Sequence, residues 1–450
     1  MTVSRPYDAY RSTGTGWCAR VPAHWDFLPL RRVGRVTGGG TPTADALNWD
    51  GDIPFMTPPD LRLANGQEVS TTQRTVSRAG AMAGSATVPA GSVVVSIRAP
   101  IGYVGRTIVE SAFNQGCRAI TPDPTSDARY TAYSLIASRD ELDAQGRGTT
   151  FMEVSGSQFL AIAVPVPPIQ EQQAIADFLD EQTSRIDTLI GKQTQLIDTL
   201  RERRTAVTES AVLSGLDRNT YRVPAPVKWL PGAPPSWKWL QLGFVADTLA
   251  GYAFPSDGFQ LDPRQTRLLR GVNVKPGGLD WTEVVYWDEL ARPVPEEFRL
   301  AEGDVVVGMD RPFVGAGSRV AALREHDLPA LLLQRVMRLR AGGEILQEYL
   351  RLVLATNAFG AYVAPLFTGV SVPHMSEWQV RKFVIPLPSL EEQQLIVEYL
   401  DGQTTKIDAL ISKAEELIAL AQERRAALIT AAVTGQIDVR TAERTATVDA

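Results

Sequence analysis

An internal duplication constrains this chain more than any other feature of its sequence. The segment AGSVVVSIRAP (90–100) returns 212 residues later as EGDVVVGMDRP (302–312), and PVPPIQEQQAIADFLD (165–180) returns 221 residues later as PLPSLEEQQLIVEYLD (386–401). Insertions separate the two copies only in the middle. A repeat of this size predicts two similar halves of about 210 residues, each with a globular part followed by a helical part.

Each helical part carries apolar residues at alternating steps of four and three, the spacing of a coiled-coil seam. Prolines precede both parts and Gly215 and Gly435 follow them. We therefore expect two helices of about 35 residues, each roughly 50 Å long. They are expected to pack on each other; docking of each helix on its own globular part or on other chains is the alternative, because a seam does not name its partner. The seam residues are Ile175, Leu179, Ile186, Leu189, Leu196, Leu200, Val207, Ile396, Leu400, Ile407, Leu410, Leu417 and Leu428.

The globular parts have the pattern of α+β domains rich in short strands. β-Branched runs at 93–97 and 305–307 each follow a glycine, and Gly and Pro turn signals are dense. Helices are expected at 131–138 and 348–356, one in each copy. The predicted division is a first globular domain with an N-terminal segment over 1–163, a helical region over 164–215, a second globular domain over 216–383, a second helical region over 384–436 and a tail over 437–450.

The charge of the chain is acidic overall but unevenly distributed. Its 45 Lys+Arg stand against 51 Asp+Glu, and the deficit lies in the two helical regions. The first globular domain contains no lysine, so its positive charge comes from arginine, the residue that makes bidentate contacts to guanine edges and phosphates. This composition permits DNA binding, and the codon usage of a GC-rich genome explains it equally well.

A search for catalytic or metal-binding patterns returns nothing. Cys18 and Cys117 are too few for a disulfide framework or a zinc ribbon, and the three histidines are scattered. The glycine-rich GGGTP (38–42) lacks the Lys-Ser/Thr of a P-loop. His374 has no histidine counterpart in the first copy, where Glu153 holds the equivalent place. We expect no catalytic residue, metal or cofactor in this chain. Because no apolar run approaches the ~18 residues of a membrane span, we also expect a soluble protein of the reducing cytoplasm.

This order of parts resembles the specificity subunit of type I restriction–modification systems over nearly the whole chain. YRSTGTGWCARVPAHW (10–25) is similar to the N-terminal segment of that family, and GGGTPTADALNWDGDIPFMTPPDL (38–61) and LLRGVNV (268–274) are similar to two varieties of its target-recognition domains. PIQEQQAIADFL (168–179) and SLEEQQLIVEYL (389–400) resemble the openings of its two helical regions. The copies differ before a shared proline, where Ala99 stands in the first and Arg311 in the second.

The resemblance implies a non-catalytic subunit that binds double-stranded DNA. Two target-recognition domains in pseudo-twofold repeat, separated by two long antiparallel coiled-coil helices, would each read one half of an asymmetric bipartite site. By the same resemblance, two methylation subunits carrying S-adenosylmethionine dock on the chain and methylate adenine, and restriction (motor and nuclease) subunits are optional further partners. Side chains in the major groove read bases whereas helix length sets only distance, so this division of labour is physically sensible.

Two sets of polar residues are expected to contact partners. The acidic side chains of the helices are expected to face a protein partner or solvent rather than phosphate. They are Glu171, Asp177, Asp180, Asp187, Glu392, Glu398, Asp401 and Asp408. Polar residues beside predicted turns are candidates for DNA contact, although a structural role is an equal alternative for each. They are Thr57, Asp60, Arg98, Tyr103, Asn114, Gln115, Thr149 and Thr150 in the first domain and Arg270, Asn273, Arg311, Gln334 and Ser371 in the second.

Two other classes of protein compete with this interpretation. One is a non-enzymatic protein-interaction scaffold with a coiled-coil spacer, for which DNA binding would be absent or insensitive to salt. The other is a self-sufficient enzyme, which would need a cofactor site that the sequence does not display.

Overall fold

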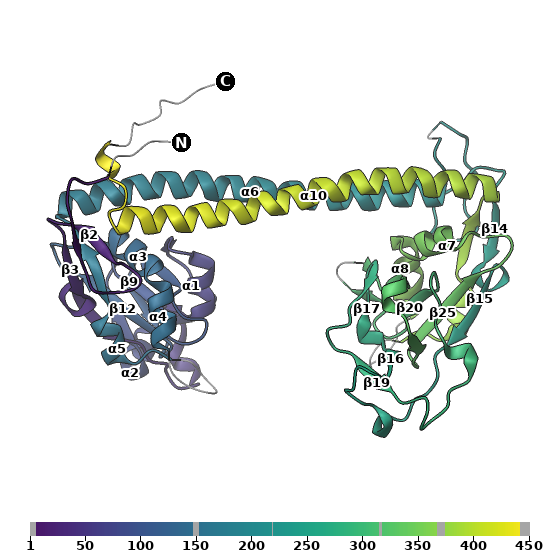
Figure 1. The fold of residues 1–450 in the computed structure, drawn as a ribbon, viewed down its shortest axis with the longest axis horizontal. Coiled ribbons are helices and arrows are strands. Elements are labelled where there is room, and N and C mark those ends of the chain that lie inside the picture. The colour runs from purple at the N-terminus through teal and green to yellow at the C-terminus, as the bar shows by residue number, and fades with distance from the viewer. Residues whose placement is uncertain (1–5, 147–152, 218, 315–316, 367–373, 442–450) are drawn as a thin grey trace. The chain divides into compact units, whose positions relative to one another are not determined.

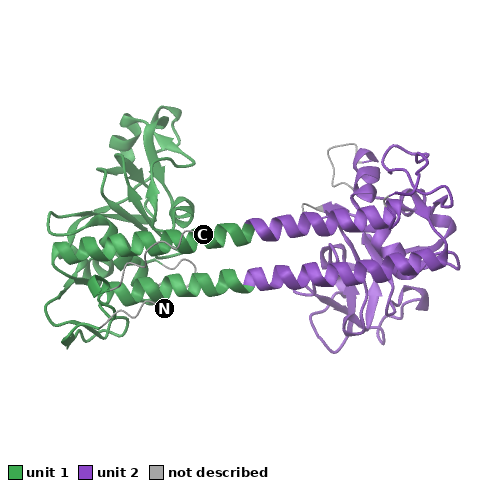
Figure 2. Cartoon of the chain, turned by 90° about the horizontal axis from the view of Figure 1, so that it is seen from above, with its two compact units in different colours: residues 1–194, 416–450 green, residues 195–415 purple. Residues whose placement is uncertain are grey.

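The computed structural model describes residues 6–146, 153–217, 219–314, 317–366 and 374–441. Two compact units emerge, one made of residues 1–194 and 416–450 and the other of residues 195–415 (Figure 2). We call them unit 1 and unit 2. Their boundaries fall inside the two long helices rather than beside the globular parts, so they divide the chain elsewhere than the five predicted segments do.

Unit 1 holds two main sheets (Figure 1). The larger has the order β4 (Gly34–Gly38), β12 (Cys117–Pro122), β9 (Val93–Ser96), β10 (Val104–Thr107), β6 (Glu68–Val69), and the smaller β7 (Thr75–Val76), β5 (Trp49–Met56), β11 (Ser111–Phe113), β8 (Ala86–Val88). Two further pairs are β1 (Tyr10–Ser12) with β2 (Arg20–Pro22) and β3 (Asp26–Pro29) with β13 (Ala163–Val166). Its short helices are α1 (Pro58–Ala64), α2 (Arg78–Gly84), α3 (Ala128–Ala137), α4 (Arg139–Gln145) and α5 (Gly156–Ala161).

Unit 2 repeats this plan with fewer strands in its two main sheets. Its larger main sheet has the order β15 (Ala246–Ala250), β25 (Val336–Ala341), β20 (Val305–Gly308), β23 (Val320–Ala322). The smaller main sheet has the order β19 (Val285–Trp287), β16 (Thr266–Leu269), β24 (Ala330–Leu332). The smaller pairs are β14 (Lys238–Gln241) with β26 (Val384–Leu387), β17 (Val274–Lys275) with β18 (Gly278–Leu279), and β21 (Phe313–Val314) with β22 (Gly317–Ser318). Its short helices are α7 (Gln347–Leu354), α8 (Asn357–Val363) and α9 (Glu377–Arg381).

The duplicated valine run forms an inner strand of each larger sheet, β9 in unit 1 and β20 in unit 2. In unit 1, Val93 and Val95 pack into one hydrophobic core while Val94 packs into another. Because successive side chains of a strand point to opposite faces, a continuous apolar run is what a strand buried on both faces requires. In unit 2, Val305 and Val307 likewise pack into one core and Val306 into another. The predicted α+β class is confirmed, as are the predicted helices at 131–138 and 348–356, which correspond to α3 and α7.

The two long helices are longer than predicted. α6 spans Ile169–Ser214, 46 residues, and α10 spans Leu390–Val433, 44 residues. α6 begins directly after Pro168 and α10 begins two residues after Pro388, because proline suits the entrance of a helix but not its interior. Both stop at the predicted glycines, where Gly215 has φ +86° and Gly435 φ +70°, the left-handed conformation of a helix C-terminal cap. The predicted length of about 35 residues corresponds to the seams alone, 175–207 and 396–428, and each helix extends beyond its seam at both ends.

The helices run antiparallel, which the composition of each core shows. In unit 1, Ile175 from the start of α6 shares a core with Val433 from the end of α10 and with Trp25 of the globular part. In unit 2, Val212 from the end of α6 shares a core with Ile396 from the start of α10. Each helix therefore packs both on the other helix and on globular domains, so the two arrangements considered from sequence occur together.

The buried stripe of each helix departs from the predicted seam. Leu189 and Leu196 are 43% and 44% exposed, whereas the neighbouring Ile197 is 6% exposed. Leu410 and Leu417, their equivalents in the repeat, are 51% and 46% exposed. The prediction is wrong at these four positions. Six other seam residues are buried, and Ile186, Val207 and Leu428 are half-buried. The buried ones are Ile175, Leu179, Leu200, Ile396, Leu400 and Ile407.

A polar contact with the globular domain explains the shift. Thr183 is 1% exposed, and its hydroxyl lies 3.2 Å from that of Tyr133 on α3. The stripe therefore takes two successive steps of four, from Ile175 to Leu179 to Thr183, and then follows the period of about 3.6 residues of a straight α-helix. Packing on the globular domain therefore determines which face of the helix is buried. The predicted seam assumed that only a partner helix would cover that face.

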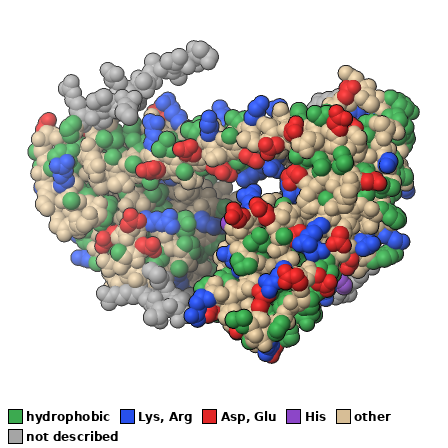
Figure 3. Space-filling model, turned by 45° about the vertical axis from the view of Figure 1, so that its right-hand side comes forward, with side chains coloured by type: hydrophobic (Ala, Val, Ile, Leu, Met, Phe, Trp, Pro, Cys, Tyr) green, Lys and Arg blue, Asp and Glu red, His purple; other side chains and the backbone are tan. Residues whose placement is uncertain are grey.

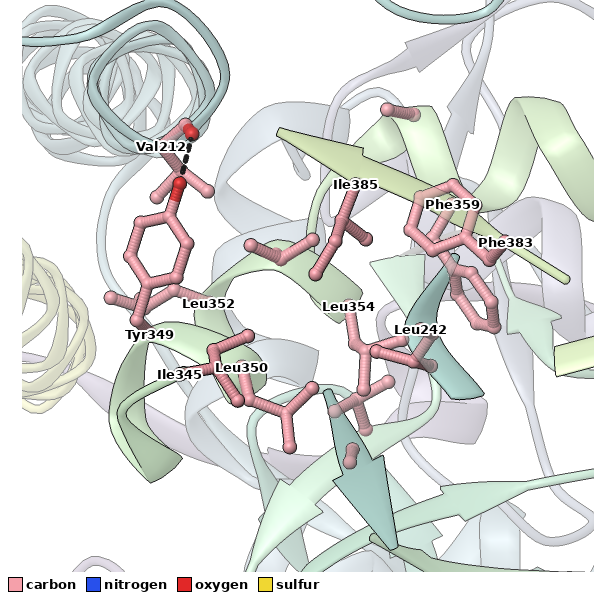
Figure 4. Packing of buried hydrophobic residues seen from close by; sticks show 14 of the residues in the cluster. Val212, Leu242, Ile345, Tyr349, Leu350, Leu352, Leu354, Phe359, Phe383 and Ile385 are labelled. Atoms are coloured by element: carbon pink, nitrogen blue, oxygen red, sulfur yellow. Dashed lines mark hydrogen bonds between the residues drawn. The ribbon is translucent and has the colours of Figure 1, made fainter. Parts of the chain in front are cut away.

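Buried polar side chains hold the ends of the helices on each unit. The phenol of Tyr130 donates to Pro165 O at 3.1 Å and to Val433 O at 3.2 Å, and it is fully buried in unit 1. In unit 2, Tyr349 bridges Val212 O at 2.8 Å and Pro386 O at 3.2 Å, inside the core shown in Figure 4. Carbonyls near a helix C-terminus have no partner within the helix, so these phenols satisfy groups that burial would otherwise leave unpaired.

The repeated Glu-Gln-Gln motif has a structural explanation as well. Gln172, 1% exposed, donates to Pro167 O at 2.8 Å and Thr125 O at 3.1 Å and accepts from Asp127 N at 2.9 Å. Gln393 makes the same three kinds of contact in unit 2, with Pro388 O, Glu344 O and Leu346 N. The motif thus joins the start of each long helix to the loop before a short helix of the same unit, α3 in unit 1 and α7 in unit 2.

Among the described residues, no helix is both long enough and apolar enough to cross a membrane.

Candidate nucleic-acid interface

The first pair of candidates, Thr57 and Asp60, caps a helix. Asp60 accepts from Thr57 N at 2.9 Å, from the Thr57 hydroxyl and from Gln73 N at 3.2 Å. Such a reciprocal bond from the third residue of a helix back to its N-cap is a capping box, here at the start of α1. Both polar groups are committed to the fold, so neither is retained in the proposed interface.

The equivalent pair in unit 2 behaves in the same way. β5 pairs with β11 and β16 with β24 in matching parallel register, which makes Arg270 and Asn273 the counterparts of Thr57 and Asp60. Asn273 is 1% exposed; it accepts from Arg270 N at 3.0 Å and donates to Asp280 O and Glu283 O. All of these bonds of the Asn273 amide lie inside the protein, so the side chain has a structural role. The Arg270 guanidinium donates to Glu283 O, while its Nε is buried without a hydrogen-bond partner.

Three loops of unit 1 converge on Gly116. A Cβ placed there would lie 3.3 Å from Asn114 Oδ1, 3.6 Å from Arg98 Cδ and 3.6 Å from Pro58 Cγ. Asn114 Oδ1 itself accepts from Gly116 N at 3.0 Å, and the exposed Gln115 accepts from the Thr41 hydroxyl. The structure thus brings Arg98, Asn114 and Gln115 to one end of the sheets, where β5, β9 and β11 end.

Arg98 contributes a cation at this place in unit 1. Its Nε lies 2.9 Å from Glu153 Oε2, and the two side chains are 43% and 38% exposed. An ion pair so accessible is weak, so the guanidinium can exchange the carboxylate for another acceptor. Tyr103 instead packs partly buried against the core, with Arg139 4.4 Å over its ring, and has a structural role.

The matching place in unit 2 is a pocket of about 560 Å³. Among its lining residues are the candidates Arg270, Arg311 and Gln334. Arg335 and Arg319 also line it, and sequence reasoning missed both. Arg335 directly follows the candidate Gln334, so its position in the same turn could have identified it as a lining residue. Arg319 lies farther along the chain, directly before β23. Only the pairing of β23 with β20 brings it to the pocket.

Glu153 and His374 hold equivalent places, as the sequence alignment of the two copies indicated. An isolated bridge joins Arg98 to Glu153 in unit 1, and one joins Asp310 to His374 in unit 2. The same position therefore carries opposite charge in the two domains, Arg98 in one and Asp310 in the other. The remaining candidates Thr149, Thr150 and Ser371 lie outside the described residues.

Most of the acidic helix residues are bound within their own unit. Glu171 is 9% exposed and accepts from Trp25 Nε1 at 2.8 Å and Arg440 Nη1 at 2.9 Å. Asp177 and Asp180 both hold Arg129. Asp187 pairs with Arg425, Asp408 with Arg204, and Glu398 accepts from Gln394. The expectation that these eight carboxylates face a protein partner or solvent is therefore wrong for Glu171, which is buried and accepts from donors of its own unit. On the face shown in Figure 3, acidic and basic side chains are mixed rather than gathered by sign.

The described residues contain no group of three or more His, Cys, Asp or Glu side chains placed to hold a metal ion. Both cysteines are buried and free of disulfides. Burial raises the pKa of the Cys18 thiol to about 11 and raises that of Cys117 still further, which suppresses the reactive thiolate.

Comparison with known proteins assigns the chain to a family. Residues 22–198 and 295–418 match the family described as Type I restriction modification DNA specificity domain. The specificity subunit of the type I restriction enzyme MjaVIII from Methanocaldococcus jannaschii is 28% identical over 70% of this chain and 71% of its own length. That of EcoAI from Escherichia coli is 32% identical over 37% of this chain and 28% of its own length.

A solved structure has the same fold. A chain of a type I R-M system, studied for its complex assembly and conformational transition, superposes with a TM-score of 0.65 at 17% identity and covers 92% of this chain and 98% of its own length. The match extends over both globular parts and both helices. With the family match covering well over half of the residues in two stretches, the chain belongs to the type I restriction modification DNA specificity domain family.

Proposed function

We propose that this chain is the DNA-recognition subunit of a type I restriction–modification complex. One globular domain reads each half of an asymmetric bipartite site, and partner subunits perform the chemistry. The observation that carries the proposal is that two domains of one topology present different polar side chains at the same end of their sheets. Arg98 and Glu153 in unit 1 stand where Asp310 and His374 stand in unit 2. Different side chains at one position read different bases, so the two half-sites differ.

The partners follow from the same proposal. Two methylation subunits carrying S-adenosylmethionine would flip and methylate one adenine in each half-site, because extracting a base requires a pocket built for it. A nuclease subunit is an optional addition. A complex that modifies chromosomal DNA would act in the cytoplasm, so we propose that location for this chain. What supports this division of labour is the family of the chain and a candidate interface composed of binding side chains.

A map of N6-methyladenine across the genome of the source cell, with and without the gene for this chain, tests the proposal. Loss of methylation from one asymmetric, bipartite motif is the expected result, and it supplies both half-sites and the spacer. An unchanged map in cells that express a methylation partner would contradict it. Binding of the purified complex that does not weaken with salt would favour a protein-interaction scaffold instead, because phosphate contacts make affinity fall as salt rises.

A further inference from the structure

Positive charge converges on the pocket of unit 2. Five of its described lining residues are cationic and one is acidic. They are Arg270, Lys275, Arg311, Arg319, Arg335 and Asp310. The pocket lies where β16, β20 and β24 end, which is the place in unit 2 that corresponds to the convergence on Gly116 in unit 1.

The acidic residue does not neutralise this cluster. Asp310 Oδ1 lies 3.6 Å from Arg335 Nη1, with the two side chains 35% and 51% exposed. No hydrogen bond or ion pair joins Arg311 to any residue that the structure describes. Arg319 donates to carbonyls, Val274 O at 2.9 Å and Asp310 O at 2.6 Å, which orient its guanidinium without cancelling its charge. Burial, together with the nearby Arg311, lowers the pKa of Arg319 although Asp310 opposes the shift.

Two of these arginines occupy backbone positions that arginine disfavours. Arg311 has φ +43° and Arg335 φ +72°, in the left-handed region that glycine or asparagine enters more easily. Both lie in the turns that bound the pocket and both side chains are exposed. Retaining a long cationic side chain at a strained turn indicates that the side chain has a use there.

The fold itself does not require these cations. Ser96 pairs with Cys117 and Gly308 with Val336, so Arg335 corresponds to Gly116. Pairing of β9 with β10 and of β20 with β23 makes Tyr103 the counterpart of Arg319. Ala99 stands at the place of Arg311. A domain of the same topology therefore forms with none of the three, and the cluster belongs to whatever unit 2 binds.

The chemistry of the cluster selects the ligand. Guanidinium and ammonium groups donate hydrogen bonds and accept none, so they complement a group that offers several anionic oxygens. In the major groove each base pair presents a donor as well as acceptors, whereas a phosphodiester group presents acceptors only. Resting on the proposed function, we infer that this pocket holds a phosphodiester group of the DNA backbone, contacted by Arg311 and Arg335 and positioned by Arg319.

The test measures how binding depends on salt. The full-length chain, purified with its methylation subunits, is titrated with a duplex carrying the mapped motif and with a scrambled duplex, at salt concentrations from 50 to 300 mM. Arg311→Gly and Arg335→Gly remove the side chains while keeping a residue that suits the positive φ. Arg264→Gln is the control, because Arg264 is an 87% exposed arginine of the same unit that does not line the pocket.

Each glycine variant is expected to reduce the slope of log affinity against log salt by about 0.9 and to weaken both duplexes by a similar factor of about three- to tenfold. The control should match the wild type. In a scan of the cognate duplex with single methylphosphonate linkages, one neutral linkage should weaken the wild type but add nothing to the loss in Arg335→Gly. Equal thermal unfolding of the variants shows that the loss is not misfolding.

An unchanged slope in both variants would overturn the inference. A loss confined to the cognate duplex, with a relaxed methylation motif, would overturn it in favour of a guanine contact. If the wild-type complex binds neither duplex, the proposed function fails rather than this assignment, which keeps the two failures distinct.

Discussion

The phenol of Tyr349 lies 2.8 Å from the carbonyl oxygen of Val212, near the C-terminus of the first long helix. In unit 1 the phenol of Tyr130 holds Val433 O near the C-terminus of the second long helix. Each globular domain thus secures the end of the helix that belongs to the other half of the sequence repeat, while it also holds the carbonyl of the proline strand before its own helix. The duplication is therefore interlocked rather than merely consecutive.

Tyr349→Phe should destabilise unit 2. The substitution removes one phenol that satisfies two carbonyls, and burial leaves those carbonyls unpaired at a cost of about 1–3 kcal/mol. Thermal or denaturant unfolding of the full chain measures the effect, with Tyr221→Phe, 74% exposed, as the control. A Tyr349→Phe variant as stable as the control would mean that the bridge contributes nothing.

Two ion pairs at equivalent places in the repeat should differ in strength because they differ in burial. Arg425 is 10% exposed and pairs with Asp187 at 3.1 Å, whereas Arg204 is 48% exposed and pairs with Asp408 at 2.9 Å. Arg204→Ala should cost less than about 1 kcal/mol. Arg425→Ala should cost on the order of 2–4 kcal/mol, because it also removes the buried stem and the bond to Asn65 O. Equal losses in denaturant unfolding would refute the argument from burial.

Neighbouring residues of the first helix test the corrected stripe. Ile197→Ala should lower the free energy of unfolding by about 2–4 kcal/mol, because it opens a cavity in a buried site. Leu196→Ala removes a side chain that is 44% exposed and should cost much less. If Leu196→Ala proves the more damaging of the two, the seam predicted from sequence is the correct one.

Arg98→Ala should change only one half of the methylation motif. If Arg98 exchanges Glu153 for a base, its loss removes about 1–3 kcal/mol of discrimination at one position of the half-site read by unit 1. Methylome sequencing of cells carrying the variant measures this, with Arg78→Ala as an exposed arginine of the same unit for comparison. A motif identical to that of the wild type would remove Arg98 from the interface.

The two thiols should be inert in the folded protein. Burial raises the pKa of Cys18 to about 11, and Cys117 is 0% exposed, so almost no accessible thiolate exists at pH 8. Iodoacetamide at pH 8 should label neither cysteine of the native chain and both after unfolding in guanidinium. Rapid labelling of one native thiol would show that its core opens.

Much of the fold could be predicted because its signals are local. The proline runs and Gly215 and Gly435 delimit the helices through backbone preferences that each residue carries in any context. The valine runs indicated one strand in each copy because β-branched residues favour the extended backbone. Duplication supplied the domain plan, and the family follows from the order of these parts.

The sites and the helix faces were decided by tertiary structure alone. Thr57, Asp60 and Asn273 looked like polar loop residues, and only the three-dimensional arrangement shows their groups already used in capping. Leu189 has the spacing of a seam residue, but the face of the helix that is buried is the one whose Thr183 contacts Tyr133. The sequence by itself therefore determined the two long helices, one valine strand and one short helix in each copy, and the fact that this plan occurs twice. Tertiary structure determined which side chains meet, because strand register and domain packing join turns far apart in the chain, such as those of Arg311 and Arg335, and local preference carries no information about such pairings.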